Sequence, residues 1–119
     1  MASPLTPDAP ARSPSPVVIV LTTLPADADA VAFARALVDE HLAACVSVGA
    51  EMQSVYRWQG SVEQDCERQI VVKTVRDMVG PLRTRMATLH PYEVPEFLVI
   101  TAGDGGEAYL EWVRQSTRA

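Results

Sequence analysis

Basic residues are scarce in this chain of 119 residues, and lysine is almost absent. Ten Lys and Arg stand against fifteen Asp and Glu, which gives a net charge of −5, and Lys73 is the only lysine. A protein that grips a nucleic-acid backbone needs clustered basic side chains to displace counterions. Scattered arginines argue equally against binding to an anionic membrane surface. The composition therefore predicts neither a nucleic-acid partner nor a membrane partner.

Cysteine and long apolar runs are also lacking. The two cysteines, Cys45 and Cys66, are too few for a disulfide framework. No apolar run approaches the roughly 20 residues that span a bilayer. The N-terminus lacks the basic start and apolar centre of a secretory signal. We therefore expect a cytoplasmic protein in a reducing setting.

Proline is concentrated at the N-terminus, where residues 1–16 hold five of the nine prolines, spaced with Ala, Ser and Thr. Such a segment has little apolar surface to bury, so it is expected to form a disordered tail. The remaining residues, 17–119, are long enough to bury a core of their own and are expected to form one domain.

The first half of this domain predicts a strand, a helix and a long extended segment. The β-branched run at 17–21 is typical of a central strand, and Asp27 or Asp29 follows in a position to cap a helix. Helical spacing then continues to about His41, through Val31, Ala34, Leu37 or Val38, and Leu42. Residues 43–58 are extended, with Gly49 at the position of a bulge.

The second half repeats the pattern. A turn at 59–61 leads into a return strand at 62–74. A helix starting near Asp77 carries an apolar face of Met78, Leu82, Met86 and Leu89. A strand at 97–100 and a final helix around Trp112 complete the chain. The order β-α-β-β-α-β predicts an α+β, ferredoxin-like sandwich with an extra C-terminal helix.

The predicted hairpin is longer than the helices that should cover it. Helices of about 13 residues reach roughly 20 Å, whereas strands of about 15 residues reach roughly 50 Å. The overhang carries Tyr56 and Trp58, whose large side chains gain from burial, beside strand edges that invite pairing. We expect other copies of the chain to cover it, giving a homo-oligomer. The alternative is a flexible functional loop.

Five segments resemble, in order, the CutA family of divalent-cation tolerance proteins. They are LAACV at 42–46, SVYRWQG at 54–60, VKT at 72–74, HPYEVPE at 90–96 and YLEWV at 109–113. The resemblance extends from 17 to 118, and HPYEVPE together with YRWQG is its most specific part. It implies a ferredoxin-like homotrimer packed by strand pairing between subunits. It also implies an association with copper or another divalent cation as the bound ion.

The family also resembles the trimeric PII signalling proteins in shape. That similarity implies an alternative function, a PII-like sensor that binds a small ligand or an unidentified partner protein at subunit clefts. The residues expected to line such an interface or cleft are Tyr56, Trp58, Lys73, Tyr92, Glu93 and Glu96. A purely structural hydrogen-bond network explains the same residues equally well, because buried polar groups need partners.

Cys45 and His90 match positions discussed as copper ligands in the family, and thiolate and imidazole are donors that copper prefers. The alternatives are that Cys45 is a small buried hydrophobe and that His90 favours the end of its helix. Some relatives carry another cysteine where this chain has Thr22 and Thr23. Its absence removes a soft ligand and argues against high-affinity Cu(I) binding.

Three acidic residues, Glu63, Asp65 and Glu67, alternate on the return strand and should face one side. With oxygens from a neighbouring chain they could hold a hard cation. The alternative is a solvated strand face.

Motifs of catalysis are missing, since the chain has no glycine-rich phosphate loop, no His-Glu-x-x-His and no Cys-x-x-Cys. A nucleophilic Cys45 would need a base and a third residue to orient that base, and the sequence does not supply the set. The missing motifs predict that the chain is not an enzyme, and the resemblance to the CutA family implies a role in divalent-cation tolerance.

Overall fold

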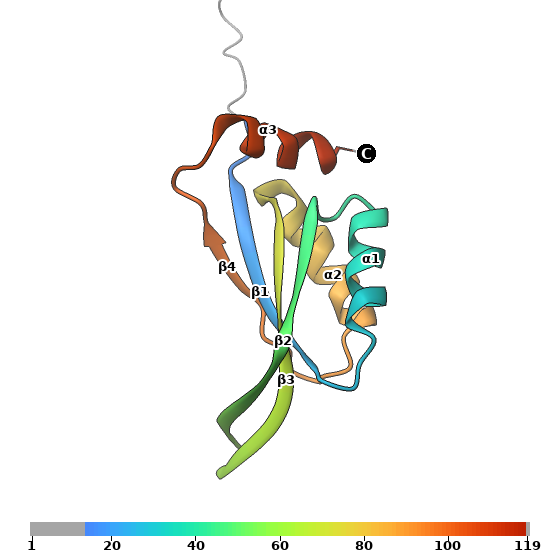
Figure 1. Ribbon diagram of the computed structural model, residues 1–119, viewed down its shortest axis with the longest axis vertical. Helices are drawn as coiled ribbons and strands as arrows, with labels where there is room; N and C mark the ends of the chain where they lie inside the picture. The colour runs from blue at the N-terminus through green and yellow to red at the C-terminus, as the bar shows by residue number, and fades with distance from the viewer. Residues whose placement is uncertain (1–13, 119) are drawn as a thin grey trace, which may run out of the picture.

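The computed structural model describes residues 14–118, and its centre is a four-stranded antiparallel sheet (Figure 1). The strands are β1 (Val17–Pro25), β2 (Cys45–Trp58), β3 (Ser61–Val75) and β4 (Leu98–Thr101). They lie in the order β2-β3-β1-β4, with β1 hydrogen-bonded to both β3 and β4. The β-branched run therefore forms a central strand, as predicted.

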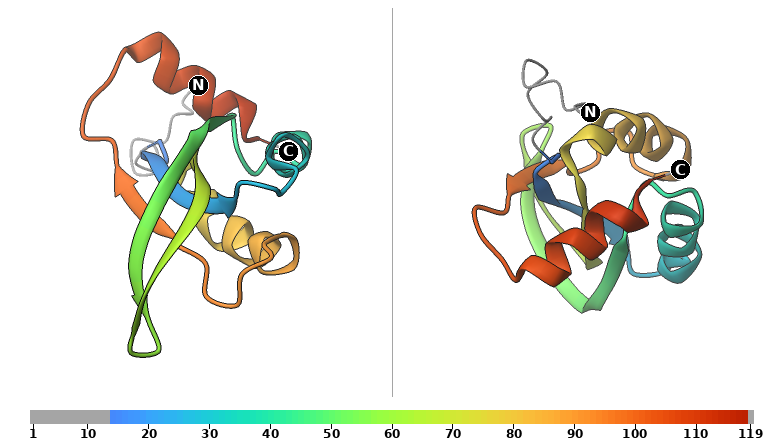
Figure 2. Two further views of the ribbon diagram at one scale, coloured as in Figure 1. Left: turned by 60° about the horizontal axis from the view of Figure 1, so that its bottom comes forward. Right: turned by 90° about the horizontal axis from the view of Figure 1, so that it is seen from above.

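Two helices cover one face of this sheet, and a third crosses the ends of its strands (Figure 2). They are α1 (Ala30–Asp39), α2 (Val79–Leu89) and α3 (Glu107–Ser116), and a 3₁₀ turn, η1 (Arg76–Met78), precedes α2. The element order and the antiparallel strand order agree with the predicted ferredoxin-like arrangement and its added helix.

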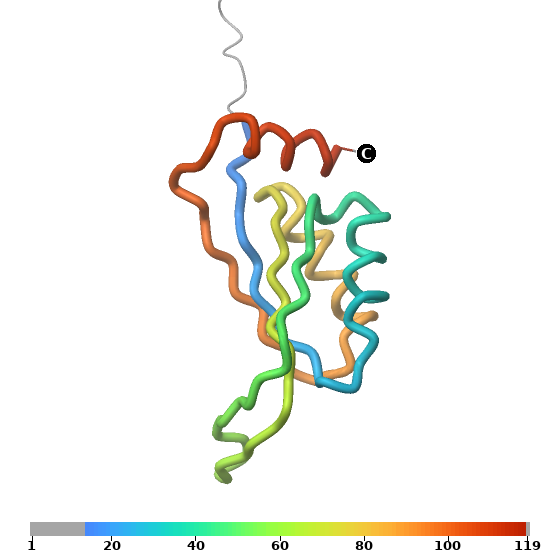
Figure 3. The backbone as a smooth tube through the Cα atoms, in the orientation of Figure 1, coloured from blue at the N-terminus to red at the C-terminus, as the bar shows by residue number. Residues whose placement is uncertain are grey.

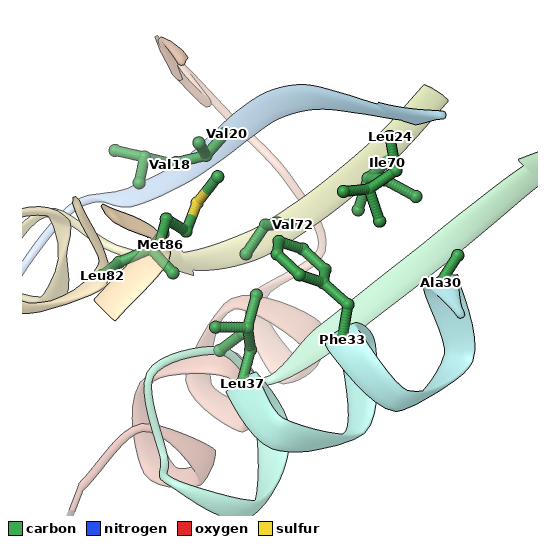
Figure 4. Close-up of a cluster of buried hydrophobic side chains, with 11 residues drawn as sticks. Val18, Val20, Leu24, Ala30, Phe33, Leu37, Ile70, Val72, Leu82 and Met86 are labelled. Atoms are coloured by element: carbon green, nitrogen blue, oxygen red, sulfur yellow. The ribbon is translucent and has the colours of Figure 1, made fainter. Parts of the chain in front are cut away.

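The core lies between the sheet and helices α1 and α2 (Figure 4). Alternation along β1 and β3 places Val18, Val20, Ile70 and Val72 on the helix-facing side, where all four are fully buried. Helix α1 contributes Phe33 and Leu37, and α2 contributes Leu82 and Met86.

Helix α1 begins as expected and buries Ala34 and Leu37 as predicted, but it does not bury Val31. The Asp29 carboxylate accepts a hydrogen bond from the backbone N–H of Ala32 at 3.0 Å, so Asp29 is the N-cap. The prediction that Val31 belongs to the apolar face is wrong, because its side chain is 61% exposed. The buried stripe is formed by Ala30, Phe33, Ala34 and Leu37. Spacing alone does not decide whether Ala30 and Phe33 or Val31 flank Ala34 on the buried face, and the packing against the sheet selects Ala30 and Phe33.

The long hairpin is present, and Gly49 lies at a β-bulge. Gly49 and Ala50 together oppose Gln69, between the pairs Val48–Ile70 and Glu51–Arg68. A side chain at position 49 would place its Cβ 2.9 Å from the carbonyl oxygen of Gln69. The bulge predicted from the sequence is therefore confirmed.

The hairpin closes through two residues in the left-handed region, Gln59 (φ 50°) and Gly60 (φ 84°), as two-residue hairpin loops do. Strand β1 pairs with β3 only as far as Glu67. Residues 53–58 and 61–66, which we call the distal ribbon, have only each other as strand partners and project beyond the helices (Figure 3). At the base of the ribbon, the Ala26 N–H still donates to the Cys66 carbonyl at 3.0 Å. The predicted overhang is confirmed.

A disordered tail was predicted for residues 1–16, and residues 1–13 of it lie outside the described residues. Ser15 and Pro16 are bound to the domain: Asp77 N–H donates to Ser15 Oγ at 3.1 Å and Arg76 N–H donates to the Pro16 carbonyl at 2.9 Å. The Arg114 guanidinium also donates to the Ser15 carbonyl at 3.1 Å. The hydrogen-bonded part of the chain thus begins slightly before the first strand. Within residues 14–118, the helices are too short or too polar to cross a membrane.

Candidate functional site

The segment that follows α2 is anchored by His90. Because Pro91 disfavours helical geometry for the residue before it, His90 is extended (φ −84°, ψ 132°) and ends the helix. Its Nδ1 accepts a hydrogen bond from Tyr92 N–H at 3.1 Å, so the ring proton is on Nε2. That proton is donated to the Thr23 carbonyl at 2.7 Å, with the Thr22 hydroxyl at 3.2 Å.

The surroundings of His90 favour the neutral ring. Its ring is buried and meets Phe33 edge-on, with 6.1 Å between ring centroids. Burial lowers the pKa of His90, and it outweighs the Thr23 carbonyl and the charge of Glu67, which act in the opposite direction. Both ring nitrogens are already engaged in one chain, so His90 serves as a structural tie between α2 and β1.

Cys45 lies on the other side of the sheet from His90. On β3 its partner is Lys73, while the adjacent Val46 opposes Val72 and packs against the helix-facing core. Successive side chains of a strand point to opposite faces, so the half-buried Cys45 thiol points away from the helices. One chain therefore does not bring Cys45 and His90 together.

The acidic residues of β3 share a face, as predicted, but two of them are hydrogen-bonded to tyrosines. Asp65 accepts from the hydroxyl of Tyr56, and Glu67 accepts from the hydroxyl of Tyr92 at 2.5 Å. Across the described part of the chain, no three His, Cys, Asp or Glu side chains gather closely enough to hold a metal ion. Within one chain, residues 14–118 therefore do not form a metal centre on their own.

A cleft of about 660 Å³ lies between the hairpin and the segment 92–96. Alternation on β2 after the bulge directs Met52, Ser54, Tyr56 and Trp58 into it. Five of the six residues predicted at a subunit interface or cleft line this cleft within one chain, namely Tyr56, Trp58, Tyr92, Glu93 and Glu96. Their place between subunits stays a prediction. Lys73 is outside this cleft, six residues along β3 from Glu67.

Several cleft residues were not foreseen from the sequence, among them Thr23 and Gln69. The Gln69 amide donates to the Thr22 carbonyl at 2.7 Å and to Glu96 Oε2 at 3.0 Å, which fixes Glu96 against the sheet. Strand alternation could have predicted Gln69 as a cleft residue, because it follows Glu67 by two residues and so shares its strand face.

The cleft is negatively charged. Its carboxylates come from Glu67, Glu93 and Glu96, and no Lys, Arg or His of residues 14–118 lines it. Burial and the hydrogen bond to Glu67 raise the pKa of Tyr92. The hydrogen bond to Asp65 raises the pKa of Tyr56 to about 12. Both phenols therefore stay protonated and donate, which leaves the carboxylates as the only charged groups on the described cleft walls.

Comparison with known sequences identifies the family. Residues 18–116 match the family model described as CutA1 divalent ion tolerance protein. The chain belongs to the CutA family. A relative named divalent-cation tolerance protein CutA, from Thermus thermophilus, is 42% identical over 99 residues, which cover 83% of this chain and 96% of the relative. The solved structure of a divalent cation tolerance protein from Thermus thermophilus aligns with a TM-score of 0.82 at 41% identity. It covers 86% of this chain and 99% of that one.

A plant relative, the chloroplastic CutA protein of Arabidopsis thaliana, is 36% identical over 103 residues. These residues cover 87% of this chain but only 57% of the relative, so the CutA-family chain spans little more than half of the plant protein. The name of the Thermus thermophilus relative describes a tolerance protein, and neither of the two names describes a reaction. Because one of these relatives is named for the chloroplast, the cytoplasmic location of this chain stays a prediction.

Proposed function

We propose that this CutA-family chain serves divalent-cation tolerance as a homotrimer that binds copper or another divalent cation without catalysing a reaction. The observation that carries the proposal is the family match across residues 18–116, together with relatives named for that tolerance. The PII-like sensor, binding a small ligand or a partner protein at subunit clefts, stays a prediction of the sequence.

Exposed apolar residues support the assembly. Leu98 and Ile100 on β4 are 55% and 48% exposed. They oppose Leu21 and Ile19 on the sheet face that α1 and α2 leave open. Tyr109 and Trp112 of α3 are also exposed and lie together, with 5.5 Å between ring centroids. Burial of such a surface by further copies is favourable, since large exposed apolar patches mark interaction sites.

The metal part of the proposal requires more than one copy, because the ligands of a single chain are not gathered. Cys45 is the donor on which it relies, since its free thiol is half-buried on the open face of the sheet. His90 would take part only after losing the hydrogen bond from Tyr92 N–H or its own to the Thr23 carbonyl. Glu63, Asp65 and Glu67 stay a weaker prediction of the same kind.

Calorimetric titration of copper and of zinc into the purified protein tests the metal site. We expect binding at about micromolar affinity or tighter in the wild type, and a loss of at least about tenfold in Cys45→Ser. Cys66→Ser is the matched control, because Cys66 is an exposed thiol on the distal ribbon, and it should titrate like the wild type. Wild-type protein that binds neither metal, with Cys45→Ser giving identical traces, would refute direct binding.

A further inference from the structure

The only lysine of the chain lies on the sheet face that α1 and α2 leave open. Lys73 opposes Ile19 on β1 and Cys45 on β2, and side chains of directly paired residues point to the same face. The residue is half-buried within one chain. No carboxylate of residues 14–118 forms an ion pair with it. In a single chain the charge of Lys73 therefore depends on water.

Glu67 is a buried carboxylate that lacks a cation. The residue is only 8% exposed in one chain, and contact with a second copy can only reduce that fraction. Its Oε2 accepts the hydrogen bond from Tyr92, whereas no described residue donates to Oε1. Among residues 14–118, no Arg, Lys or His forms an ion pair with it. An ionised carboxylate in such a place costs free energy unless a positive group pairs with it.

These two charges share the open face but are too far apart to meet within one chain. Lys73 follows Glu67 by six residues on β3, so alternation directs both side chains to the same side. Six residue steps of a strand cover roughly 20 Å, which is beyond the reach of the two side chains toward each other. Leu98 and Ile100 on the same face would be buried in the homotrimer, and Lys73 would lose its water with them. A lysine buried there without a partner would oppose assembly.

Lys73 is also the only basic residue on the open face of the described sheet. Alternation directs Arg57 and Arg68 to the opposite face, where Arg57 is paired with Val62. Arg68 is already engaged, since its guanidinium donates to the Gly49 carbonyl at 3.1 Å. If the contact between copies supplies a cation from this face, that cation is therefore Lys73.

Glu67 is the acidic residue of β3 that most needs this cation. Glu63 and Asp65 share its strand face, but both are exposed on the distal ribbon, where water can solvate a charge. Copies in a cyclic trimer meet through two different patches, so a position on one copy faces a different position on the next. A contact between Lys73 at one end of β3 and Glu67 nearer the hairpin satisfies that condition.

We infer that Lys73 of one copy pairs with Glu67 of a neighbouring copy and so neutralises the cleft between the neighbour's hairpin and its residues 92–96. The ammonium group donates to the free Oε1, while the Tyr92 hydroxyl keeps Oε2. This inference rests on the homotrimer proposed above. It also accounts for Lys73 as the predicted cleft residue that one chain leaves outside the cleft, because Lys73 enters from another copy.

A double-replacement cycle tests the pair by urea unfolding at fixed protein concentration. Glu67→Gln keeps an oxygen to accept from Tyr92, and Lys73→Met keeps a long side chain without its charge. Each single replacement leaves the other charge buried and unpaired, so each should lower the urea midpoint. The double replacement should lower it by less than the sum of the two single shifts, because neither charge remains. Single shifts that simply add would overturn the inference.

Glu63→Gln is the matched control, because it makes the same change of charge on the same strand face but at an exposed position. Combined with Lys73→Met, it should give shifts that add. Coupling of Lys73 to Glu63 and not to Glu67 would contradict the assigned partner.

A carbodiimide cross-link on the wild-type protein gives a second measurement that does not depend on a variant folding. The reagent activates a carboxylate, and a lysine amine in contact with it then forms an amide with net loss of one water. Because Lys73 is the only lysine, mass spectrometry of the linked peptides identifies its partner. We expect a link from Lys73 to Glu67 and a covalent dimer under denaturing conditions. No link, or a link to another carboxylate in place of Glu67, would count against the pair.

Light scattering on the same wild-type sample separates the two ways in which the idea could fail. A monomer would refute the proposed homotrimer and this pair with it. A trimer in which Lys73 and Glu67 neither couple nor cross-link would refute the pair alone.

Discussion

Among single residues, His90 has the widest influence on the cleft. Its ring receives the backbone N–H of Tyr92 and donates to β1, so it fixes the start of the segment 92–96. Tyr92 in turn donates to Glu67 on β3. His90 was predicted as a metal ligand, and in the structure it instead positions the Glu67 carboxylate through Tyr92.

Acidification should therefore destabilise the protein through His90. Its folded pKa is lowered from the ordinary value of 6.5, so the unfolded chain takes up a proton more readily than the folded one. The stability contributed by neutral His90 is complete above about pH 6.5 and is lost as pH falls through the folded pKa. Urea unfolding at about pH 7.5 and about pH 5.5 measures the loss.

His90→Asn should be less stable at the higher pH and should lose less stability on acidification than the wild type. His41→Asn is the control, since His41 is an exposed histidine with φ 59° and Asn tolerates that conformation. It should keep the pH dependence of the wild type. Identical pH dependence in all three proteins would show that His90 is not the titrating group.

At the scale of elements, the bulge in β2 decides which side chains meet. Cys45 and Tyr56 are eleven residues apart, so a regular strand would direct them to opposite faces. Because Gly49 and Ala50 both oppose Gln69, the alternation of side chains between the two faces of β2 shifts by one residue after the bulge. Cys45 opposite Lys73 and Tyr56 opposite Glu63 therefore lie on the same open face.

Replacement of Gly49 by Ala should strain this junction. The new Cβ would lie 2.9 Å from the Gln69 carbonyl oxygen, which belongs to the backbone of β3 and cannot rotate away. We expect a loss of about 1–3 kcal/mol in the free energy of unfolding, measured in urea at fixed protein concentration. Gly80→Ala is the control: position 80 is in α2 with no atom within 4 Å of a new Cβ, so it should gain up to about 1 kcal/mol. A Gly49→Ala protein as stable as Gly80→Ala would contradict the strain.

Periodicity and turn residues predicted the elements and their order, because these signals are local. The strand at 17–21, the cap at Asp29, the bulge at Gly49 and the end of α2 at His90 all follow from neighbouring residues. The bond between Glu67 and Tyr92 joins residues 25 apart, and local patterns cannot reveal it. The opposite faces of Cys45 and His90 likewise depend on the register of β2 with β3 and on the packing of α2.

For the whole molecule, the distal ribbon and the open sheet face both leave apolar side chains exposed in one chain. A two-stranded ribbon is marginal in water, and Val55 and Val62 add exposed apolar side chains to it. Packing of several copies through the open face, with each copy covering another's ribbon, would bury both surfaces at once. This is the physical basis for expecting a homo-oligomer, and the expectation of three copies comes from the family resemblance.

Light scattering should give a particle of about three times the 12.9 kDa chain mass. Ile100→Asp puts a charge on the open face and should shift the protein toward monomer, because an unpaired charge in an interface is costly. Val31→Asp is the control, since Val31 is exposed on α1, on the opposite side of the sheet. It should leave the mass unchanged. A monodisperse wild-type monomer would refute the assembly.

The two ends of β3 lie far apart, and the N-terminal segment is bound to only one of them. Val75 pairs with Val17 at one end of the sheet, and Ser61 begins the strand at the hairpin tip (Figure 1). The 14 residue steps between them amount to roughly 45 Å. Ser15 is also fastened to Asp77 and Arg114. A surface tether attached at Pro14, the first described residue, would therefore lie near the end of β3 opposite the hairpin tip, so that the hairpin tip of an immobilised protein points away from the surface.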